Sequence, residues 1–244
     1  MKVLLWDLEC SPHQVYTWGL FNQNISLSQV EKPGEVISFA AKWYQKSKVT
    51  FRSTFHDGKE AMLQSAWELL DEADALVSWN GKSFDTKTMN KEFILAGMTP
   101  PSPAAEIDLM LAVKKRARML SNKLQFVSTA MGLEGKVQHE GFDLWRAVMD
   151  GDERAWARMK RYNIQDVRLL EDLYAKLLPW LPSHPNVTLF DEAAGCPKCG
   201  SSNIQKRGFA YTQVSKFQQW ACMACGGWFR SGKREAGADL RSVA

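Results

Sequence analysis

The stretch Val3–Glu9, V-L-L-W-D-L-E, decides the fold of this chain. Four apolar residues followed by an acidic pair predict a short, buried β-strand that ends in carboxylates. Because Asp7 and Glu9 are two residues apart on a strand, both side chains leave the same face. A strand end is rigid, so two carboxylates on one face are well placed to hold a divalent metal ion.

The rest of the first 178 residues alternates strand and helix patterns. Runs rich in β-branched and aromatic residues predict strands, and apolar residues three or four apart predict helices. The expected strands are 36–43, 48–54 and 75–79, and the expected helices are 59–73, 85–96, a basic helix after Asp108, and 152–178. This order predicts an α/β fold with a mixed sheet flanked by helices.

Two further acidic patches accompany Asp7 and Glu9. Asp85 ends W-N-G-K-S-F-D at the start of a predicted helix, and Asp166 ends Y-N-I-Q-D, four residues after Tyr162. Four residues on a helix place Tyr162 and Asp166 on one face. Taken singly, these residues could be surface charge, a helix N-cap or a core tyrosine. Together they indicate a cage for two divalent ions, which commonly cut phosphodiester bonds.

The three patches resemble the three exonuclease motifs of the DEDD family of 3′→5′ exonucleases, in its tyrosine variant. The resemblance covers roughly residues 1–178 and is strongest to proofreading domains of family-B polymerases and stand-alone bacterial and phage relatives. It implies a ribonuclease H-like fold and two-metal-ion hydrolysis of single-stranded DNA that releases 5′-mononucleotides. It also implies a catalytic set of Asp7, Glu9, Asp85, Tyr162 and Asp166.

The resemblance further implies a role for each residue. Asp7, Glu9 and Asp166 would hold one Mg²⁺ or Mn²⁺, and Asp7 and Asp85 would contribute to a second. The reference pKa of tyrosine, near ~10, makes Tyr162 a poor base, so it would orient the attacking water. Many family members have Thr after the first-motif Glu, whereas this chain has Cys10.

Four residues outside the acidic set are candidates for substrate binding. Asn80 could position the strand end, or it could be a turn residue in Asn-Gly. Trp18 and Phe21 could stack on bases, or they could pack in the core. Lys123 and the basic helix after Asp108 could contact phosphates, or they could be solvated charges. Asp108 itself is interpreted as a helix cap.

The C-terminal part contains two C-x-x-C pairs, which are typical of a structural zinc site. The ligands would be Cys196, Cys199, Cys222 and Cys225, and the pattern resembles a zinc ribbon. A redox motif is the weaker alternative. Basic and aromatic residues interleave between the pairs, which suits single-stranded nucleic acid, although a ribbon can also dock a protein partner. Cys10 is left as a reduced, buried thiol.

Charge and proline content suggest how the chain is divided. Residues 194–244 carry a net charge of +6, and the remainder carries −2. Prolines punctuate the stretch after residue 178. We therefore expect an exonuclease domain over 1–178, a linker over 179–193, a zinc ribbon over 194–230 and a flexible tail over 231–244.

No apolar run reaches the roughly 20 residues of a membrane span, and the N-terminus does not resemble a signal peptide. We therefore expect a cytoplasmic protein, in the host cytoplasm if it is viral. The leading function is a DNA 3′→5′ exonuclease with two Mg²⁺ or Mn²⁺ and one Zn²⁺. An exoribonuclease is the alternative with the same chemistry, and an adaptor whose ribbon docks a replication or repair protein is the alternative from another class.

Overall fold

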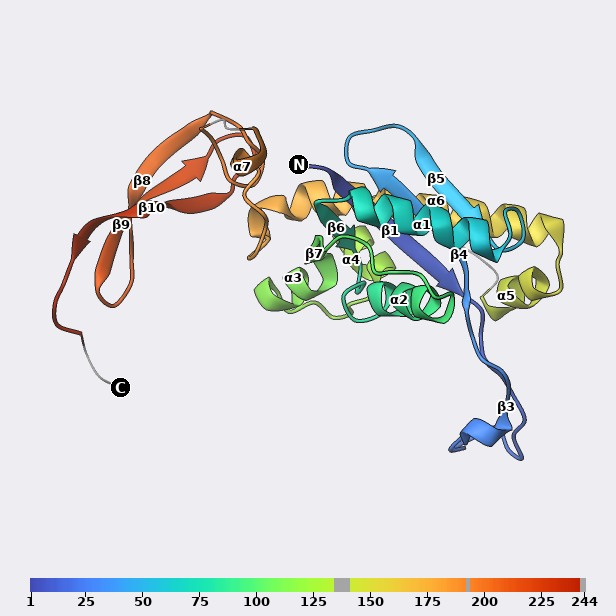
Figure 1. Ribbon diagram of the computed structural model, residues 1–244. Helices are drawn as coiled ribbons and strands as arrows, with labels where there is room; N and C mark the ends of the chain where they lie inside the picture. Colours follow the sequence, from blue (N-terminus) through green and yellow to red (C-terminus); the bar gives the residue numbers. More distant parts are fainter. Residues whose placement is uncertain (134–140, 192–193, 242–244) are drawn as a thin grey trace.

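The computed structural model describes residues 1–133, 141–191 and 194–241 (Figure 1). Its centre is a five-stranded sheet in which β1 is antiparallel to β4 and parallel to β6. In spatial order the strands are β5 (Val49–Ser53), β4 (Val36–Trp43), β1 (Val3–Cys10), β6 (Ala75–Ser78) and β7 (Ala105–Asp108). The mixed sheet predicted from the sequence is confirmed.

Helices cover both faces of this sheet. Helices α1 (Lys59–Glu72) and α2 (Asp85–Leu95) pack on one face, and the long helix α6 (Glu153–Leu177) packs on the other. Smaller helices complete the layers: α3 (Leu109–Arg116), α4 (Leu124–Ala130) and α5 (Phe142–Met149). Among the described residues, no helix is long and apolar enough to cross a bilayer.

The alternation along β1 assigns its two faces. Leu4, Trp6 and Leu8 are buried among residues of α1 and α2. Leu5, on the opposite face, is buried in the cluster that contains the apolar residues of α6. Since side chains alternate along a strand, Asp7 and Glu9 lie on the α6 side of the sheet, toward the C-terminal end of its central strand.

The predicted helix ends agree closely with the structure. The Asp108 carboxylate accepts a hydrogen bond of 3.1 Å from the Leu111 N–H, which confirms this residue as the cap of α3. Asp152 caps α6 in the same way through the Ala155 N–H, at 2.8 Å. Gly97, with φ +70°, follows α2, since this left-handed conformation suits glycine.

A narrow arm projects from the sheet where β1 ends (Figure 1). It consists of β2 (Gln14–Val15), a short 3₁₀ turn η1 (Leu27–Gln29) and β3 (Val30–Lys32). Trp18 is 100% exposed and Phe21 is 83% exposed on this arm. The alternative that these two aromatic residues pack in the core is therefore wrong.

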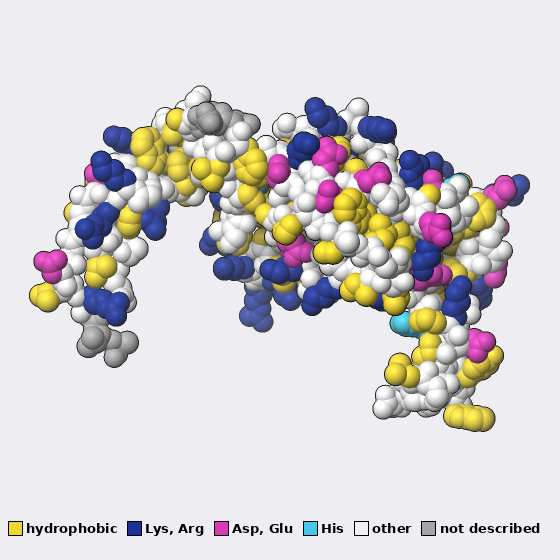
Figure 2. Space-filling view, viewed as in Figure 1, with side chains coloured by type: hydrophobic (Ala, Val, Ile, Leu, Met, Phe, Trp, Pro, Cys, Tyr) yellow, Lys and Arg dark blue, Asp and Glu magenta, His cyan; other side chains and the backbone are white. Residues whose placement is uncertain are grey.

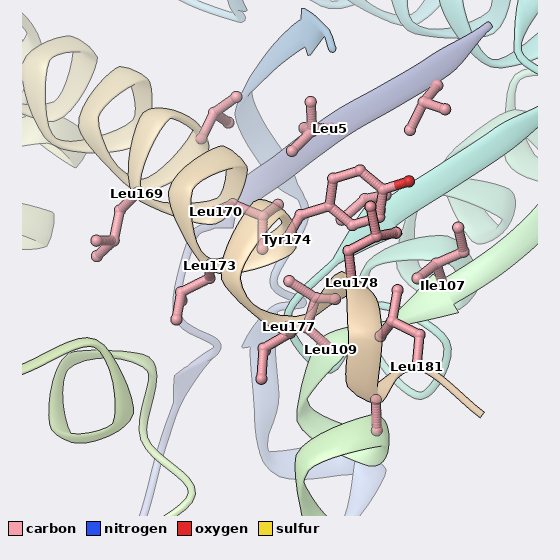
Figure 3. Packing of buried hydrophobic residues seen from close by; sticks show 14 of the residues in the cluster. Leu5, Ile107, Leu109, Leu169, Leu170, Leu173, Tyr174, Leu177, Leu178 and Leu181 are labelled. Carbon is pink, nitrogen blue, oxygen red and sulfur yellow. The ribbon is translucent and has the colours of Figure 1, made fainter. Parts of the chain in front are cut away.

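The chain directly after residue 178 belongs to the core rather than to a free linker. A 3₁₀ turn, η2 (Leu178–Trp180), follows α6, and both Leu178 and Leu181 are buried beside Ile107 and Leu109 (Figure 3). The prolines do end α6, as expected. The tight turn nevertheless returns the two leucines to the apolar cluster, so the expected linker start at residue 179 needs correction.

The C-terminal part forms a separate antiparallel sheet in the order β10-β9-β8. Its strands are β8 (Ile204–Tyr211), β9 (Ser215–Cys222) and β10 (Trp228–Gly237), and a short helix α7 (Thr188–Asp191) precedes them. Strand β10 continues to Gly237, which pairs with Ser215, so the tail does not begin at residue 231. Backbone pairing orders these residues although nearly all are exposed, and apolar patterning could not have revealed them.

Candidate active site and cysteine cluster

Three carboxylates meet between β1 and α6. One oxygen from each of Asp7, Glu9 and Asp166 lies within 4.8 Å of the other two. Asp166 is 3% exposed, because α6 lies across the sheet and turns this position toward β1. Two residues from the N-terminal strand and one from the last long helix are thus brought together as the sequence predicted.

Asn163 belongs to this cluster and was not predicted. Its side-chain N–H donates to Asp7 Oδ2 at 2.8 Å and to the Asp7 carbonyl oxygen at 3.3 Å, and the residue is fully buried. The bonds fix the orientation of the Asp7 carboxylate. A signal existed in Y-N-I-Q-D, since Asn163 precedes Asp166 by three residues and therefore shares its helix face.

Tyr162 lies one helical turn before Asp166 and is 5% exposed. Burial, followed by the nearby charges of Asp166, Glu9 and Asp7, raises its pKa far above the usual value for tyrosine. The hydroxyl is therefore protonated at neutral pH and can donate a hydrogen bond. Trp145 packs edge-on against the ring at 6.1 Å and donates to the Cys10 carbonyl oxygen at 3.0 Å, which joins α5 to the end of β1.

Asp85 is buried but stands apart from the three clustered carboxylates. Burial raises its pKa to about 7, with the charge of Asp108 adding to the effect; N–H groups of Leu8 and Asp85 itself act in the opposite direction. It does not cap α2, because the N-cap position is Phe84. A carboxylate that is costly to ionise next to other carboxylates suits a position that becomes charged when a cation binds.

Gly81 allows the chain to approach Asp85 closely. A Cβ at this position would come within 2.1 Å of Ser78 Oγ and 3.3 Å of Asp85 Oδ2. The preceding Asn80 has φ +71°, and its N–H donates to Asp108 Oδ1 at 3.1 Å. The turn that joins β6 to α2 therefore requires both residues of Asn-Gly, as the turn interpretation of Asn80 expected.

The remaining predicted contacts lie away from the carboxylates. Lys123 is exposed at the N-terminus of α4, and Trp18 and Phe21 lie on the projecting arm. Cys10 is half-buried, and burial together with the charge of Glu9 raises its pKa to about 12. Its thiol is thus protonated at neutral pH and does not act as a nucleophile.

The chemistry of the acidic donor set fits Mg²⁺ or Mn²⁺. These hard cations prefer carboxylate oxygens and retain several waters. Asp7, Glu9 and Asp166 supply such oxygens within 4.8 Å of one another. Like charges this close repel each other, and a bound cation removes that repulsion. The three residues therefore suit such an ion in chemistry and in spacing alike.

The four cysteine sulfurs also form one cluster. The Sγ atoms of Cys196 and Cys225 are 3.7 Å apart, and those of Cys199 and Cys222 are 3.6 Å apart. Tetrahedral zinc with Zn–S bonds of about 2.3 Å requires sulfur atoms about 3.8 Å apart. The Cys222 sulfur also accepts the Cys225 N–H, at 3.5 Å. The spacing fits zinc, which would be held by protein ligands alone.

The cysteine cluster lies against the end of the main core. Lys198 Nζ donates to the Pro179 carbonyl oxygen at 2.6 Å, and the Val187 N–H donates to the Pro197 carbonyl oxygen at 2.9 Å. Cys225 packs against the apolar cluster that contains Leu178 and Leu181. The cysteine loops and the core therefore share a contact.

Comparisons with known proteins agree with this architecture. A family model described as RNase H superfamily matches residues 17–178, a range that includes Asp85, Tyr162 and Asp166 but begins after Glu9. The family B DNA polymerase from the hyperthermophilic archaeon Pyrobaculum calidifontis superposes with a TM-score of 0.56 at 17% identity, over 73% of this chain. This chain spans 24% of the polymerase. No curated protein matches in sequence.

Proposed function

The chain belongs to the RNase H superfamily, and from that premise we propose that it is a metal-dependent 3′→5′ exonuclease of the tyrosine-type DEDD family, acting on single-stranded DNA. One observation carries the proposal. Asp7, Glu9 and Asp166, from the first strand and the last long helix, direct carboxylate oxygens to one point, with Tyr162 one turn away. The likeness to a DNA polymerase supports the fold on which this site depends.

The proposed chemistry distributes distinct tasks among these residues. Asp7, Glu9 and Asp166 would hold one divalent ion, and Asp85 would contribute to a second together with Asp7. The ions supply positive charge that stabilises the developing charge on the phosphate and the leaving oxygen. Tyr162, kept protonated by its surroundings, orients the attacking water by hydrogen bonding. Asn163 is a positioning residue, because it holds the Asp7 carboxylate.

The C-terminal sheet is proposed to bind the substrate strand, as a zinc ribbon that brings nucleic acid to the carboxylates. Three cation–aromatic pairs support this role: Lys206 over Trp220, Lys216 over Phe209 and Arg230 over Phe217. Such side chains offer charge for phosphates and rings for bases. Asn80, Trp18, Phe21 and Lys123 remain proposed substrate contacts.

The decisive experiment is digestion of single strands labelled at the 3′ or the 5′ end. With Mg²⁺ or Mn²⁺, a 3′→5′ exonuclease releases the 3′ label at once as a mononucleotide, while the 5′-labelled strand shortens in steps of one nucleotide. DNA and RNA strands of one sequence decide the sugar preference. Early internal fragments would contradict the exonuclease, and faster RNA digestion would replace DNA with RNA as the substrate.

A matched pair of variants connects the activity to the site. Asp7→Asn keeps an oxygen for Asn163 but removes a charge, so we expect activity to fall at least about a hundredfold. Asp172→Asn changes an exposed aspartate on the same helix as Asp166 and should leave activity unchanged. Equal activity in the two variants would exclude the carboxylate cluster as the catalytic site.

A further inference from the structure

A basic surface begins beside Asp108 and follows α3 away from the carboxylates. A depression next to Asp108 is lined by Lys82 and Lys115. A second depression shares Lys115 and adds Lys114, Arg116, Arg118 and Asn122. Lys and Arg side chains gather over α3 in the space-filling view (Figure 2). The two depressions share Lys115 and are contiguous. The depression lined by Lys82 also borders Asp108, whose charge contributes to the raised pKa of Asp85.

The cations of this surface are exposed, and Glu106 and Asp108 are the acidic residues that line the first depression with them. Within residues 1–133, 141–191 and 194–241, no carboxylate lies within ion-pair distance of Lys82, Lys115 or Arg118. By contrast, Lys42 and Lys59 are paired with glutamates. Lys82, Lys114, Lys115, Arg116 and Arg118 outnumber Glu106 and Asp108 in the lining of the two depressions, and such an excess of unpaired cations favours a polyanion.

An aromatic side chain lies on the same surface. Trp180 is 62% exposed and borders an apolar pocket that also contains Met119 and Leu181. Arg116 lines this pocket as well, and its Nε–H donates to the Trp180 carbonyl oxygen at 3.2 Å. An exposed indole beside a guanidinium offers a base-stacking surface next to a phosphate-binding group.

Trp180 also lies where the main core meets the cysteine loops. Its neighbour Pro179 accepts the hydrogen bond from Lys198, which lies between Cys196 and Cys199. The depression beside Asp108, the second basic depression, Trp180 and the cysteine loops therefore adjoin one another. Shared lining residues make this surface continuous, since Lys115 joins the first depression to the second and Arg116 joins the second to the Trp180 pocket.

We propose that the surface formed by α3, its following loop and Trp180 is a single-strand binding subsite that guides the substrate from the carboxylates to the C-terminal sheet. Lys82, Lys115 and Arg118 contact phosphates, and Trp180 stacks on a base. The inference rests on the proposed function for its substrate class, but the binding step itself needs no hydrolysis.

Equilibrium binding tests the subsite. In the Asp7→Asn background, with EDTA present to prevent residual hydrolysis, fluorescence anisotropy measures the affinity for a labelled single strand over a series of salt concentrations. Lys115→Gln with Arg118→Gln should weaken binding and reduce the slope of log K against log salt by about 1.4, because each phosphate contact contributes about 0.7. An unchanged slope would overturn the phosphate-binding assignment.

The matched control removes two other lysines. Lys46→Gln with Lys48→Gln changes exposed residues that also line one depression, beyond Trp43 on the hairpin after β4. Trp43 pairs with Leu4 at the start of β1, so this hairpin lies at the opposite end of the sheet from Glu9. The control should bind as the parent protein does. If the two double variants lost the same affinity for the single strand, the loss would follow from net charge alone, and the proposed subsite would be wrong.

Trp180 is tested by two replacements. Trp180→Leu removes the ring, whereas Trp180→Phe keeps a stacking surface. We expect Leu to weaken binding at least about fivefold and Phe to retain most of the affinity. Equal binding by the two variants would overturn the stacking assignment. If the strand binds as expected but neither DNA nor RNA is cut by the unmodified chain, the exonuclease proposal fails while the subsite stands.

Discussion

The two candidate metal clusters are built in opposite ways. Asp7 and Asp166 are carried by a buried strand and a long helix that already pack in a large apolar core. Three of the cysteines lie in loops, and Cys222 ends strand β9 of a three-stranded sheet in which β9 is mostly half-buried and β10 is mostly exposed. The first cluster is a consequence of its fold, whereas the second has little else to stabilise its surroundings.

This difference concerns what holds each part together. In the main part, burial of side chains such as Leu5 and Trp6 stabilises the sheet whether or not a cation is bound. In the C-terminal sheet, only Ala221 and Cys222 of β9 are buried. Metal binding in such a module is coupled to folding. Loss of the metal ligands should therefore unfold the C-terminal sheet but leave the main part folded.

The largest effect is expected from removal of zinc. Metal analysis should find about one zinc per chain, and Cys196→Ser with Cys199→Ser should lose it. Because structural zinc contributes about 10–16 kcal/mol in small modules, β8–β10 should unfold. Hydrogen exchange would then become fast over residues 204–237 and stay slow in β1 and α6. If residues 204–237 still exchanged hydrogen slowly without zinc, the C-terminal sheet would not need the metal to fold, which would contradict this prediction.

The next largest effect is expected on catalysis at Asp166. Asp166→Asn should reduce the rate at least about a hundredfold with Mg²⁺, because a charged ligand is lost. The fold should remain, since the apolar residues of α6 are unchanged. Circular dichroism and single-turnover kinetics measure the two properties together. If the Asp166→Asn protein unfolds, the stability of the main part also depends on its metal-binding residues. The main part and the C-terminal sheet would then not differ in this respect.

The contrast also explains what could be predicted from the sequence. Strands β1 and β4 are buried on both faces and α6 buries one face, so the apolar runs and the helical spacing predict these elements within a residue or two. The cysteine pairs are evident from their spacing alone. Both candidate clusters therefore follow from the order of the amino acids.

Features held by backbone pairing or by tertiary contacts were not predictable. The extension of β10 to Gly237 carries almost no apolar pattern, and the arm before β4 consists mainly of exposed residues. The helical spacing places Asn163 on the face of Asp166, but its hydrogen bond to Asp7 requires α6 to lie across β1, and that packing does not follow from a local pattern. Leu181 returns to the core through a 3₁₀ turn in a stretch where prolines indicated a linker.

Tyr162 should produce an intermediate effect. Tyr162→Phe removes the hydroxyl and keeps the ring that Trp145 contacts, so the fold and metal affinity should be unchanged. If the hydroxyl orients water, the rate should fall about 10- to 1000-fold. The raised pKa of Tyr162 means that no loss of activity from its ionisation is expected at alkaline pH. Full activity of the Phe variant would exclude this role.

The smallest effect concerns the stability of the protein without divalent ions. Burial raises the pKa of Asp85 to about 7, so ionisation of this group opposes folding. The stability linked to Asp85 is fully present below its unfolded pKa, near ~4, and is lost as pH rises through about 7. Asp85→Asn abolishes this loss, since the amide stays neutral.

We therefore expect the Asp85→Asn protein in EDTA to unfold at the same temperature as the parent protein near pH 4, and at least about 3 °C higher above pH 8. Mn²⁺ should narrow the difference at pH 8, because a cation stabilises the ionised carboxylate of the parent and has no such partner in the variant. Asp172→Asn, on the exposed side of α6, supplies the control for loss of one charge. If the unfolding temperatures of the Asp85→Asn protein and the parent differed by the same amount at every pH, ionisation of Asp85 would not oppose folding. The stability of the main part with ionised carboxylates would then not depend on bound cations.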